Sequence, residues 1–504
     1  MKKFLIALFS LFFLLSPARA QLTQAQVNTD INNMLTSCGN GCNTAASLRA
    51  LLDILASATF QSQGASGLQV TGAQTSGSVL VATGATSAVW SPGLVGDGAT
   101  DNTTAFQALL TSVGSTGGSV NIPCGTFVIN SATSLSVGAG KDVTIRGQGI
   151  CTILAFKGTN ATSVTLGSIF SSIHWGHMRM TTDGVGTRTG LVATMSGTSA
   201  PNFTVQHAFE DMQLTGDDYQ VAAAHYWSTA LTLAGLSTVA ISDVTTAGAN
   251  GSRVGTGVLV QATNPAFAVV FNFTNYFAVS QNIGIDWETN TQGLAVVNSN
   301  FQSGNYGIKS AVAGVGLSQL SVANSQFGDN AVAGISVAAN VGDLAVVSSL
   351  FEMGTGQVGI SGTGVDFKIV GNSFLAESAA TNIGTGIALT SAGGFGTISA
   401  NGFTNLANGI TATAGSTYAS AMITNNMHAG TTTPYNISGG TNLFIVDIQP
   451  IGVGALPTCN STIQGSSMVV TDNNTAAAYR GAVTAGGALW SKVFCPVTGA
   501  WVQD

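Results

Sequence analysis

Glycine followed by isoleucine or valine recurs through the middle of this chain at nearly equal intervals. Seven such pairs are separated by steps of 27, 23, 27, 25, 27 and 23 residues. Periods of about 20 to 50 residues mark stacked repeats, in which each unit buries its apolar face against its neighbours. The pairs are Gly257-Val258, Gly284-Ile285, Gly307-Ile308, Gly334-Ile335, Gly359-Ile360, Gly386-Ile387 and Gly409-Ile410, and Ala230-Leu231 and Asn436-Ile437 extend them by 27 residues at either end. A second column, expected to lie in the core, comprises Phe301, Phe327, Phe351, Phe374 and Phe403, with Met427 next.

The composition fits a neutral, turn-rich stack of strands. Charged residues make up 7% of the 504 residues, against about 25% in ordinary soluble domains. The chain is longer than a single compact core usually allows, but a stack grows along one axis and escapes that limit. A nucleic-acid partner is excluded, because it requires a basic stripe and the chain has 14 Lys and Arg and a formal net charge of −7.

The first 20 residues have the pattern of a secretory signal peptide. Two lysines precede an apolar run from Phe4 to Leu15, and residues 18–20 form an A-x-A cleavage signal. A membrane anchor is the weaker alternative, because the apolar run is only about 12 residues long. No later stretch is apolar enough to span a bilayer. We therefore expect residues 1–20 to be removed, and the mature chain to begin at Gln21 outside the cell.

Six cysteines fall into three local pairs. Export to an oxidising compartment favours disulfides, and proximity favours bonding within each pair. Zinc is the alternative, yet no histidine stands at ligand spacing near these cysteines. We therefore expect no metal, and we expect no cofactor either. The expected disulfides are Cys38–Cys42, Cys124–Cys151 and Cys459–Cys495.

Three segments flank the repeats. Residues 21–60 are predicted to be helical, because apolar side chains recur at helical spacing on both sides of a CGNGC turn. Residues 61–93 change to Gly, Ser, Thr and Ala with short apolar bursts, which indicates a linker or a small β element. Residues 450–504 break the period and are predicted to form a small, separate β module, with strands near SMVVT, AYRGAV and LWSKVF.

The stack itself is expected to span residues 94–449 and to begin with a cap. The run GDGATDNTTAFQALL starts with a turn, after which Asp101 or Asn102 can cap a helix that carries Phe106, Leu109 and Leu110. The strand segments GGSVNIPCGTFVI and DVTIRGQGICTIL follow. Such a helix would cover the apolar face that the first coil of a stack otherwise exposes.

From about residue 165 to residue 445 the chain repeats short strands with polar corners. Segments such as LAVVNSNF, LSVANSQF and FKIVGNSF alternate apolar residues and then turn at Asn or Ser. Asn suits tight bends, because it tolerates the left-handed backbone conformation. Stacking would align these corners into Asn/Ser ladders and the phenylalanines into an internal aromatic stack. The pattern predicts an all-β fold, a parallel β-helix with three short strands and about 25 residues per coil.

The capped opening resembles the pectate-lyase-3 or rhamnogalacturonase/epimerase-like superfamily. That family begins G-D-G-x-x-D-D-T-x-A-I-Q-x-A and continues G-G-x-V-x-I-P-x-G-x-Y. Asn102 stands where the family has its second Asp, and Phe127 where it has Tyr. The resemblance implies a right-handed, single-stranded parallel β-helix over residues 94 to about 445. The matching residues are Gly96, Asp97, Gly98, Asp101, Thr103 or Thr104, Ala105, Gln107, Gly117, Gly118, Val120, Ile122, Pro123 and Gly125.

The flanks resemble phage tail-fibre and tailspike proteins. The residues that carry this resemblance are the early helical pair with SGSVLVATGATSAVWSP, and the C-terminal VTDNN and VTGAWV. The resemblance implies a protein of the virion surface, whereas the signal peptide favours a secreted protein, and both interpretations stay open. A homotrimer would fit a tailspike-like protein, although no coiled-coil heptads indicate one.

The few acidic residues are the candidates for catalysis. Adjacent strands lie about 4.8 Å apart, so carboxylates on one sheet face can reach the separations that glycoside hydrolysis needs. The polygalacturonase signature is absent, because Gly216-Asp217-Asp218 matches its D-D element alone and R-x-K is missing. The candidate catalytic residues are Glu210, Asp211, Asp217, Asp218, Asp286 and Glu288.

Each candidate also has a structural interpretation. Asp217 and Asp218 follow a glycine, which is typical of a turn. Asp286 and Glu288 would share one solvated strand face. Aromatic rings can bind the apolar faces of sugars, but they pack in cores at least as often. The candidate sugar-binding residues are Tyr219, Trp227 and Trp287.

The low density of ionisable groups favours binding over catalysis, because acid–base chemistry needs at least two positioned titratable groups. A further charged pair, Asp366 and Lys368, is expected to be a surface pair of little energetic consequence. We therefore expect a secreted or virion-associated protein that binds surface polysaccharide, as a tailspike- or adhesin-like structural protein. The alternative is a glycoside hydrolase or pectate-lyase-like enzyme that uses carboxylates on a β-helix face.

Overall fold

The computed structural model describes residues 93–504 with short gaps, together with the backbone of three earlier strands. The three strands are β1 (Gln69–Thr71), β2 (Val79–Gly84) and β3 (Ser87–Ser91). The signal segment 1–20, the helical segment 21–60 and the pair Cys38–Cys42 lie outside the described residues. The gaps are 197–204, 220–223, 263–267, 289–290, 311–318, 338–340, 363–365, 378–381, 391–392, 414–416, 439–440, 474–480 and 497–498.

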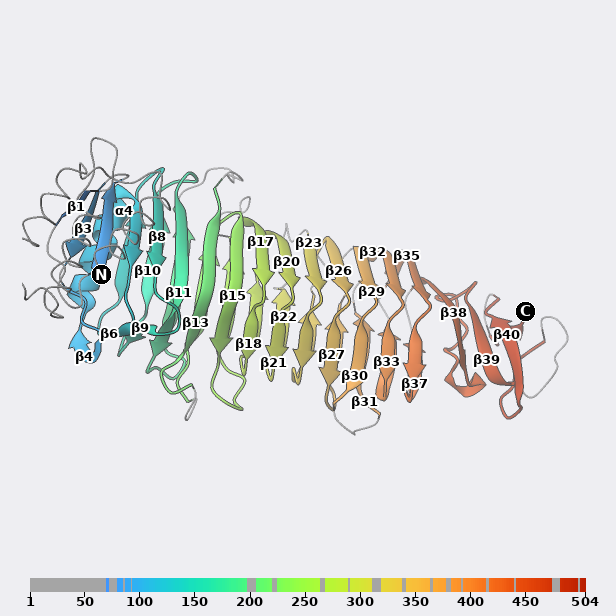
Figure 1. Ribbon diagram of the computed structural model, residues 1–504. Coiled ribbons are helices and arrows are strands. Elements are labelled where there is room, and N and C mark those ends of the chain that lie inside the picture. Colours follow the sequence, from blue (N-terminus) through green and yellow to red (C-terminus); the bar gives the residue numbers. More distant parts are fainter. Residues whose placement is uncertain are drawn as a thin grey trace, which may run out of the picture.

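The described chain forms an elongated stack of coils whose strands run across the long axis (Figure 1). It is a right-handed parallel β-helix, as the sequence predicts. Each coil contributes one strand to a twelve-stranded parallel sheet. Its strands are β7 (Thr133–Val137), β10 (Thr162–Leu166), β12 (Thr189–Met195), β14 (Thr229–Ala234), β16 (Thr256–Gln261), β19 (Ile283–Trp287), β22 (Tyr306–Ser310), β25 (Ala333–Ser336), β28 (Val358–Ser361), β31 (Ile383–Leu389), β34 (Leu406–Ala412) and β37 (Thr433–Ile437).

The rest of each coil forms two further ladders that meet at a corner. The first ladder contains β5 (Gly118–Asn121), β8 (Asp142–Arg146), β17 (Ala268–Thr274), β20 (Thr291–Val297), β23 (Gln319–Ala323), β26 (Asp343–Val347), β29 (Asp366–Val370), β32 (Gly393–Ser399), β35 (Thr417–Thr424) and β38 (Thr441–Ile451). The second contains β4 (Asp97–Asp101), β6 (Gly125–Ile129), β9 (Thr152–Phe156), β18 (Phe277–Val279), β21 (Asn300–Gln302), β24 (Gln326–Gly328), β27 (Leu350–Met353), β30 (Ser373–Ala376), β33 (Gly402–Thr404) and β36 (Met427–Ala429). Three long strands belong to both ladders, namely β11 (Ser172–Thr182), β13 (His207–Gly216) and β15 (Val239–Ala247).

From β11 to β35, each corner between these two ladders has a residue in the left-handed backbone conformation. In the long strands this position is held by His177, Asp211 and Asp243, with φ of 54°, 50° and 56°. In later coils it separates two strands and is held mostly by asparagine, which tolerates this conformation better than other residues with a side chain. The later corner residues are Asn275, Asn298, Asn324, Ser348, Gly371, Ala400 and Asn425.

From Ser299 onward, the residue after each corner points inward and forms the predicted polar ladder. The backbone N–H of Ser299 donates to Ser325 Oγ at 3.1 Å, and the same bond is repeated from Ser325 to Ser349. Asparagine then replaces serine, and Asn372 N–H donates to Asn401 Oδ1 at 3.0 Å. These residues are almost fully buried, and buried polar groups must be paired to be tolerated. The ladder therefore fixes the register of successive coils while satisfying the corner backbone.

The predicted phenylalanine column is an internal stack of rings. Successive rings from Phe301 to Phe403 have centroids 4.8 to 4.9 Å apart and are nearly parallel. The glycines of the Gly-Ile pairs lie against these rings, because a Cβ on Gly334 would come within 2.9 Å of the Phe351 ring. The isoleucines pair in register from Ile285 to Ile410 and are fully buried.

Both columns end differently from the sequence-based expectation. The ring after Phe403 belongs to His428, at 4.8 Å, while Met427 is 68% exposed. The partner of Ile410 is Tyr435 rather than Ile437, so the last Gly-Ile position is Pro434-Tyr435. In the last coil, the register set by hydrogen bonding moves the ring position from Met427 to His428, one residue later, and the isoleucine position from Ile437 to Tyr435, two residues earlier.

The predicted cap at the N-terminal end is helix α4 (Thr103–Thr116), which buries Phe106, Leu109 and Leu110 among other residues. Asp101 Oδ1 accepts the N–H of Thr103 at 2.9 Å. Gln107 Nε2 donates to Ser134 O and Gln107 Oε1 accepts from Ser134 N, both at 2.8 Å. The glutamine thus pairs with the backbone of β7, the first strand of the twelve-stranded sheet. The free edge of this strand would otherwise leave backbone N–H and C=O groups unpaired.

The segments at the two ends of the β-helix are continuous with it. β2 pairs with β5, so the described part of residues 61–93 forms a β element that adjoins the first coil. At the other end, β39 (Ser467–Asn473) pairs in parallel with β38. The predicted boundary at residue 450 falls inside β38. The C-terminal part also contains η2 (Val453–Ala455), β40 (Leu489–Phe494) and β41 (Val502–Gln503).

Two of the predicted disulfides are present. Cys124 is bonded to Cys151, and Cys459 to Cys495. The first joins the corners that follow β5 and β8, and the second joins the segment after η2 to the segment after β40. Each therefore ties together neighbouring turns of the chain near one end of the stack.

Candidate functional site

The predicted acidic residues fall into three separate groups. Glu210 and Asp211 lie at the corner of β13 and contact His177 at the corner of β11. The Asp211 carboxylate is 3.0 Å from His177 Nδ1, and the Glu210 carboxylate is 3.4 Å from Nε2. The imidazole thus occupies the space between the two carboxylates. A glycosidic oxygen could enter that space only if His177 moved, so this group is a poor catalytic pair.

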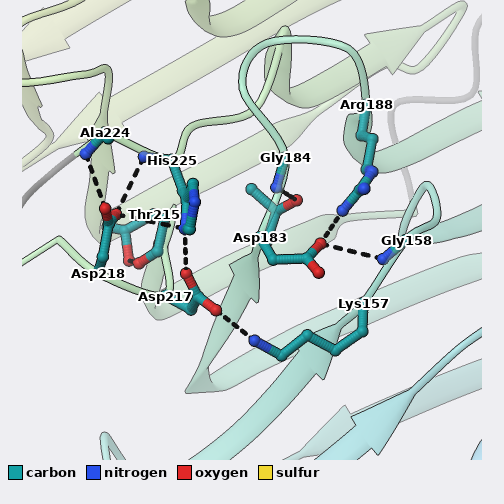
Figure 2. A network of polar contacts seen from close by, with 12 residues as sticks. Lys157, Gly158, Asp183, Gly184, Arg188, Thr215, Asp217, Asp218, Ala224 and His225 are labelled. Atoms are coloured by element: carbon teal, nitrogen blue, oxygen red, sulfur yellow. Dashed lines mark hydrogen bonds and ion pairs between the residues drawn. The ribbon is translucent and has the colours of Figure 1, made fainter.

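Asp217 follows β13 and lies in a network of charged residues from three consecutive coils (Figure 2). It forms an ion pair with Lys157 after β9 and lies 2.5 Å from His225 Nδ1. In the same network, Asp183 after β11 forms an ion pair with Arg188. Burial would raise the pKa of Asp217, but the hydrogen bonds and charges of Lys157 and His225 outweigh it and lower that pKa. The network therefore ties adjacent coils together.

Asp218 forms a turn, which was the structural interpretation of the Asp217-Asp218 pair. Its two carboxylate oxygens accept the backbone N–H groups of Ala224 at 2.9 Å and His225 at 3.0 Å. Ligand atoms of Asp217, Asp218 and His225 lie within 4.8 Å of one another, a spacing that could hold a metal ion. The oxygens of both carboxylates are already engaged by donors within the chain, so the geometry favours a bracing role. Tyr219 stands beside this turn, and burial raises the pKa of its hydroxyl.

Asp286 and Glu288 form the third group, on the outer face of the twelve-stranded sheet. Asp286 is in register with Lys309 on the next coil. Partial burial and then the charge of Glu288 raise the pKa of Asp286 to about 6, although Lys309 opposes this shift. Residues two apart on a strand are separated by about 6.6 Å. A carboxyl group with a raised pKa beside a second carboxylate is the arrangement that general acid–base chemistry needs.

The expectation that two tryptophans bind sugar is wrong. Trp227 is 1% exposed and Trp287 is fully buried. Both point inward because side chains alternate between the two faces along their segments. Trp287 therefore faces the core, while its neighbours Asp286 and Glu288 face outward. Their rings belong to the core, where Trp227 contacts the edge of Phe156. Of the predicted sugar-binding residues, Tyr219 alone is partly exposed.

A groove that the sequence-based prediction missed lies on the outer face of β26, β29, β32 and β35. Its volume is about 480 Å³. Phe395 is 66% exposed and Met422 is 48% exposed, so the groove presents an apolar surface to solvent. The Asp366 carboxylate accepts the N–H of Phe395 at 2.6 Å. Its lining residues include Asp343, Asp366, Lys368, Phe395, Ser420 and Met422.

The alternation of inward and outward side chains along β29 and β32, combined with the register of these strands, would have revealed this groove. Ile369 and Ile398 occupy equivalent inward positions on β29 and β32. Counting back from Ile398 places Gly396 inward and Phe395 outward. Asp366 and Lys368 were identified as an outward pair, but without the register nothing showed that Phe395 stands beside them.

Comparisons with known proteins identify solved structures that share the fold of this chain. Among the helices in the described part of the chain, none has the length and hydropathy needed to cross a membrane. No protein-family model matches the chain, and no curated protein matches its sequence. Solved structures with a similar fold do exist, and 23 chains match.

Three of these structures illustrate the likeness. The A-module of a mannuronan C-5 epimerase from Azotobacter vinelandii is 17% identical over 69% of this chain and 98% of that chain, with a TM-score of 0.49. The tailspike of E. coli bacteriophage HK620, in complex with a pentasaccharide, is 15% identical over 77% and 80%, with a TM-score of 0.47. Tailspike protein 3 of bacteriophage CBA120 is 15% identical over 71% and 56%, with a TM-score of 0.46. At these identities the likeness is one of fold, and the function of this chain has to be argued from its own residues.

Proposed function

We propose that this protein binds polysaccharide along the outer face of its β-helix, in the groove formed by β26, β29, β32 and β35. The observation that carries the proposal is the exposed Phe395 ring in a groove that also has charged and hydroxyl-bearing side chains. Aromatic rings suit the apolar faces of sugars, and convergent polar groups can fix their hydroxyls. Large apolar side chains gathered at the surface commonly mark a binding site.

The geometry of the sheet suits a polymer better than a compact small molecule. Lys368, Thr397 and Met422 lie in register on three successive strands, which are spaced by about 4.8 Å. The groove is therefore a row of side chains along the long axis of the molecule. An extended ligand can contact several coils of this row at once.

We further propose that the protein acts outside the cell, either secreted or on a virion surface. The signal-like residues 1–20 and the two disulfides support this location, because disulfides persist in oxidising compartments. The homotrimer stays a proposal, and analytical ultracentrifugation of the mature chain tests it. A sedimenting mass of one chain would contradict it.

The binding experiment compares the mature chain with the Phe395→Ala variant on immobilised polysaccharides. We expect the variant to lose roughly fivefold to 150-fold in affinity, since removing an aromatic contact of this kind costs on the order of 1–3 kcal/mol. Phe170→Ala is the matched control, because Phe170 is 61% exposed but lies outside the groove. Equal binding by Phe395→Ala and the parent chain would refute the proposed site.

Hydrolysis of polysaccharide is a second candidate function, and the raised pKa of Asp286 favours it. A protonated Asp286 would donate to the leaving oxygen while Glu288 acts as base or nucleophile. Activity would then fall as pH rises above about 6, where Asp286 loses its proton. The test follows reducing ends released from a polysaccharide panel by the parent chain, Asp286→Asn and Glu288→Gln. Undiminished release by both variants would remove these residues as catalysts.

A further inference from the structure

We infer that the ligand of the Phe395 groove is a neutral polysaccharide, one without carboxylate, sulfate or phosphate groups. This inference rests on the proposed binding function and specifies its substrate class. It is drawn from the charges that surround the exposed ring, which are sufficient to distinguish neutral from acidic polymers.

The groove carries more negative than positive charge. Its charged lining residues are Asp343, Asp366 and Lys368. The two carboxylates lie side by side on the adjacent strands β26 and β29, since Asp343 is in register with Asp366. Lys368 stands on the same face of β29 as Asp366, two residues away. A single ammonium group beside two carboxylates does not make a general anion site.

The Asp366 carboxylate is held beside the ring by its hydrogen bond from the Phe395 N–H. A uronate residue stacked on Phe395 would therefore bring its own carboxylate close to a fixed negative charge. Like charges at such distances disfavour binding, and a polyuronate would repeat this contact along the row. The whole chain adds to the repulsion, because its formal net charge is −7.

The polar groups that remain are suited to sugar hydroxyls. Carboxylates accept hydrogen bonds from hydroxyl groups, and Lys368 can donate to a hydroxyl or ring oxygen. Thr397 and Ser420 contribute hydroxyls that both donate and accept. This mixture, with Phe395 and Met422 as apolar surface, meets the needs of an uncharged hexose polymer without leaving an ionic group of the ligand unpaired.

The test measures binding of the mature chain to three classes of immobilised polymer at low and at physiological ionic strength. The probes are a panel of neutral glucans, mannans and galactans, the acidic polymers alginate and polygalacturonate, and the cationic polymer chitosan. We expect at least one neutral polymer to bind at least about tenfold more tightly than either acidic polymer. We also expect this binding to depend little on salt, since no ion pair with the ligand forms.

A charge variant provides a second readout. Asp343→Lys should gain at least about tenfold in affinity for an acidic polymer, because it reverses the sign of the charge beside Asp366. The matched control is Asp243→Lys, which makes the same charge change at an exposed corner outside the groove and should give no gain.

The outcomes separate the inference from the function on which it rests. Tightest binding to an acidic or cationic polymer, abolished by Phe395→Ala, would overturn the neutral class but keep the groove as the binding site. Binding to none of the polymers, or binding that Phe395→Ala leaves intact, would overturn the proposed function together with the inference. An oligomer that Phe395→Ala converts to a monomer, without any glycan binding, would assign the groove to a second copy of the chain and overturn both.

Discussion

At the scale of single residues, the Gly-Ile motif has a steric cause. A Cβ on Gly386 would lie 2.5 Å from the Phe403 ring and 2.8 Å from the carbonyl oxygen of Gly409. The ring is held in place by its stacked neighbours, so it cannot move aside at low cost. Glycine recurs at this position because the aromatic stack leaves no room for any side chain.

We therefore expect Gly386→Ala to destabilise the protein by about 1–3 kcal/mol, the usual cost of overpacking a core. The measurement is the denaturant midpoint of unfolding, followed by circular dichroism. Gly402→Ala is the control, because no atom lies within 4 Å of a Cβ built there. If both variants lose the same stability, the steric explanation fails.

His428 continues the phenylalanine stack with a titratable ring. Burial lowers the pKa of His428 to about 4, and burial with the nearby charge of His174 lowers the pKa of His207 to about 4 as well. The unfolded chain binds these protons near pH 6.5. Stability is therefore lost as pH falls from about 6.5 to about 4, by up to roughly 3 kcal/mol per histidine.

His428→Phe should reduce this acid sensitivity, because a phenylalanine ring has no proton to bind and fits the same column. The measurement is the free energy of unfolding at pH 7 and at pH 5 for the variant and the parent chain. The expected result is a smaller difference between the two pH values in the variant. An unchanged difference would show that His428 does not contribute to the acid response.

Which residues face outward could be predicted only in part. The sequence identified the acidic residues but not their neighbours, because contacts such as His177 with Asp211 join residues 34 positions apart. Nor did it separate buried from exposed aromatic residues, since Trp287 and Phe395 differ only in strand parity and register. Where alternation was clear, as for Asp286 and Glu288, the shared face was predicted.

At the scale of elements, the inward polar ladder sets the spacing between coils. Asn401 Oδ1 accepts from both the N–H and the side-chain amide of Asn372, at 3.0 Å each, and Asn401 Nδ2 donates to Ile369 O and Asn426 Oδ1. Every group of the Asn401 amide is thus used within the buried corner. The loss of this side chain leaves polar groups of several coils without partners.

Asn401→Ala should accordingly destabilise the protein by about 2 kcal/mol or more, because buried donors left unpaired are costly. Asn305→Ala provides the comparison, since its exposed side chain makes one bond to Asn282 and its loss should change stability by less than about 0.5 kcal/mol. Equilibrium unfolding in urea measures both. Similar effects of the two substitutions would contradict the assigned role of the ladder.

The element pattern was largely readable from the sequence. Short alternating strands, Asn/Ser corners and the capping helix follow from local chemistry and were predicted. The pairing of β38 with β39, and of β2 with β5, was not, because it depends on hydrogen bonding between segments whose sequences break the repeat. Register shifts in the pairing of β38 with its neighbours have the same origin.

At the scale of the whole molecule, each coil of the central stack contacts its immediate neighbours. Stability in such a stack is approximately a sum of coil and interface contributions, and local opening then begins where a coil has a neighbour on one side. The helix α4 and the strands β39 to β41 cover the two ends (Figure 1). Both disulfides lie near these ends.

We expect backbone amide hydrogen exchange to be slowest in the central strands β22, β25 and β28, and to become faster toward both ends. Mass spectrometry of peptides after exchange measures this profile. Reduction of the Cys459–Cys495 disulfide should accelerate exchange in β39 and β40 while leaving β25 unchanged. Uniform exchange along the stack would show that the molecule opens as a single cooperative unit.

The repeated corner also makes the length of this protein an adjustable quantity. Asn298 and Asn324 occupy equivalent corner positions, as do the following residues Ser299 and Ser325. Excision of residues 299–324 would join Asn298 to Ser325 and restore the same corner sequence, with one coil fewer. Evolution can therefore shorten or extend the β-helix by whole coils. Such a change alters the distance between the N-terminal flank and the Phe395 groove and leaves both ends of the molecule unchanged.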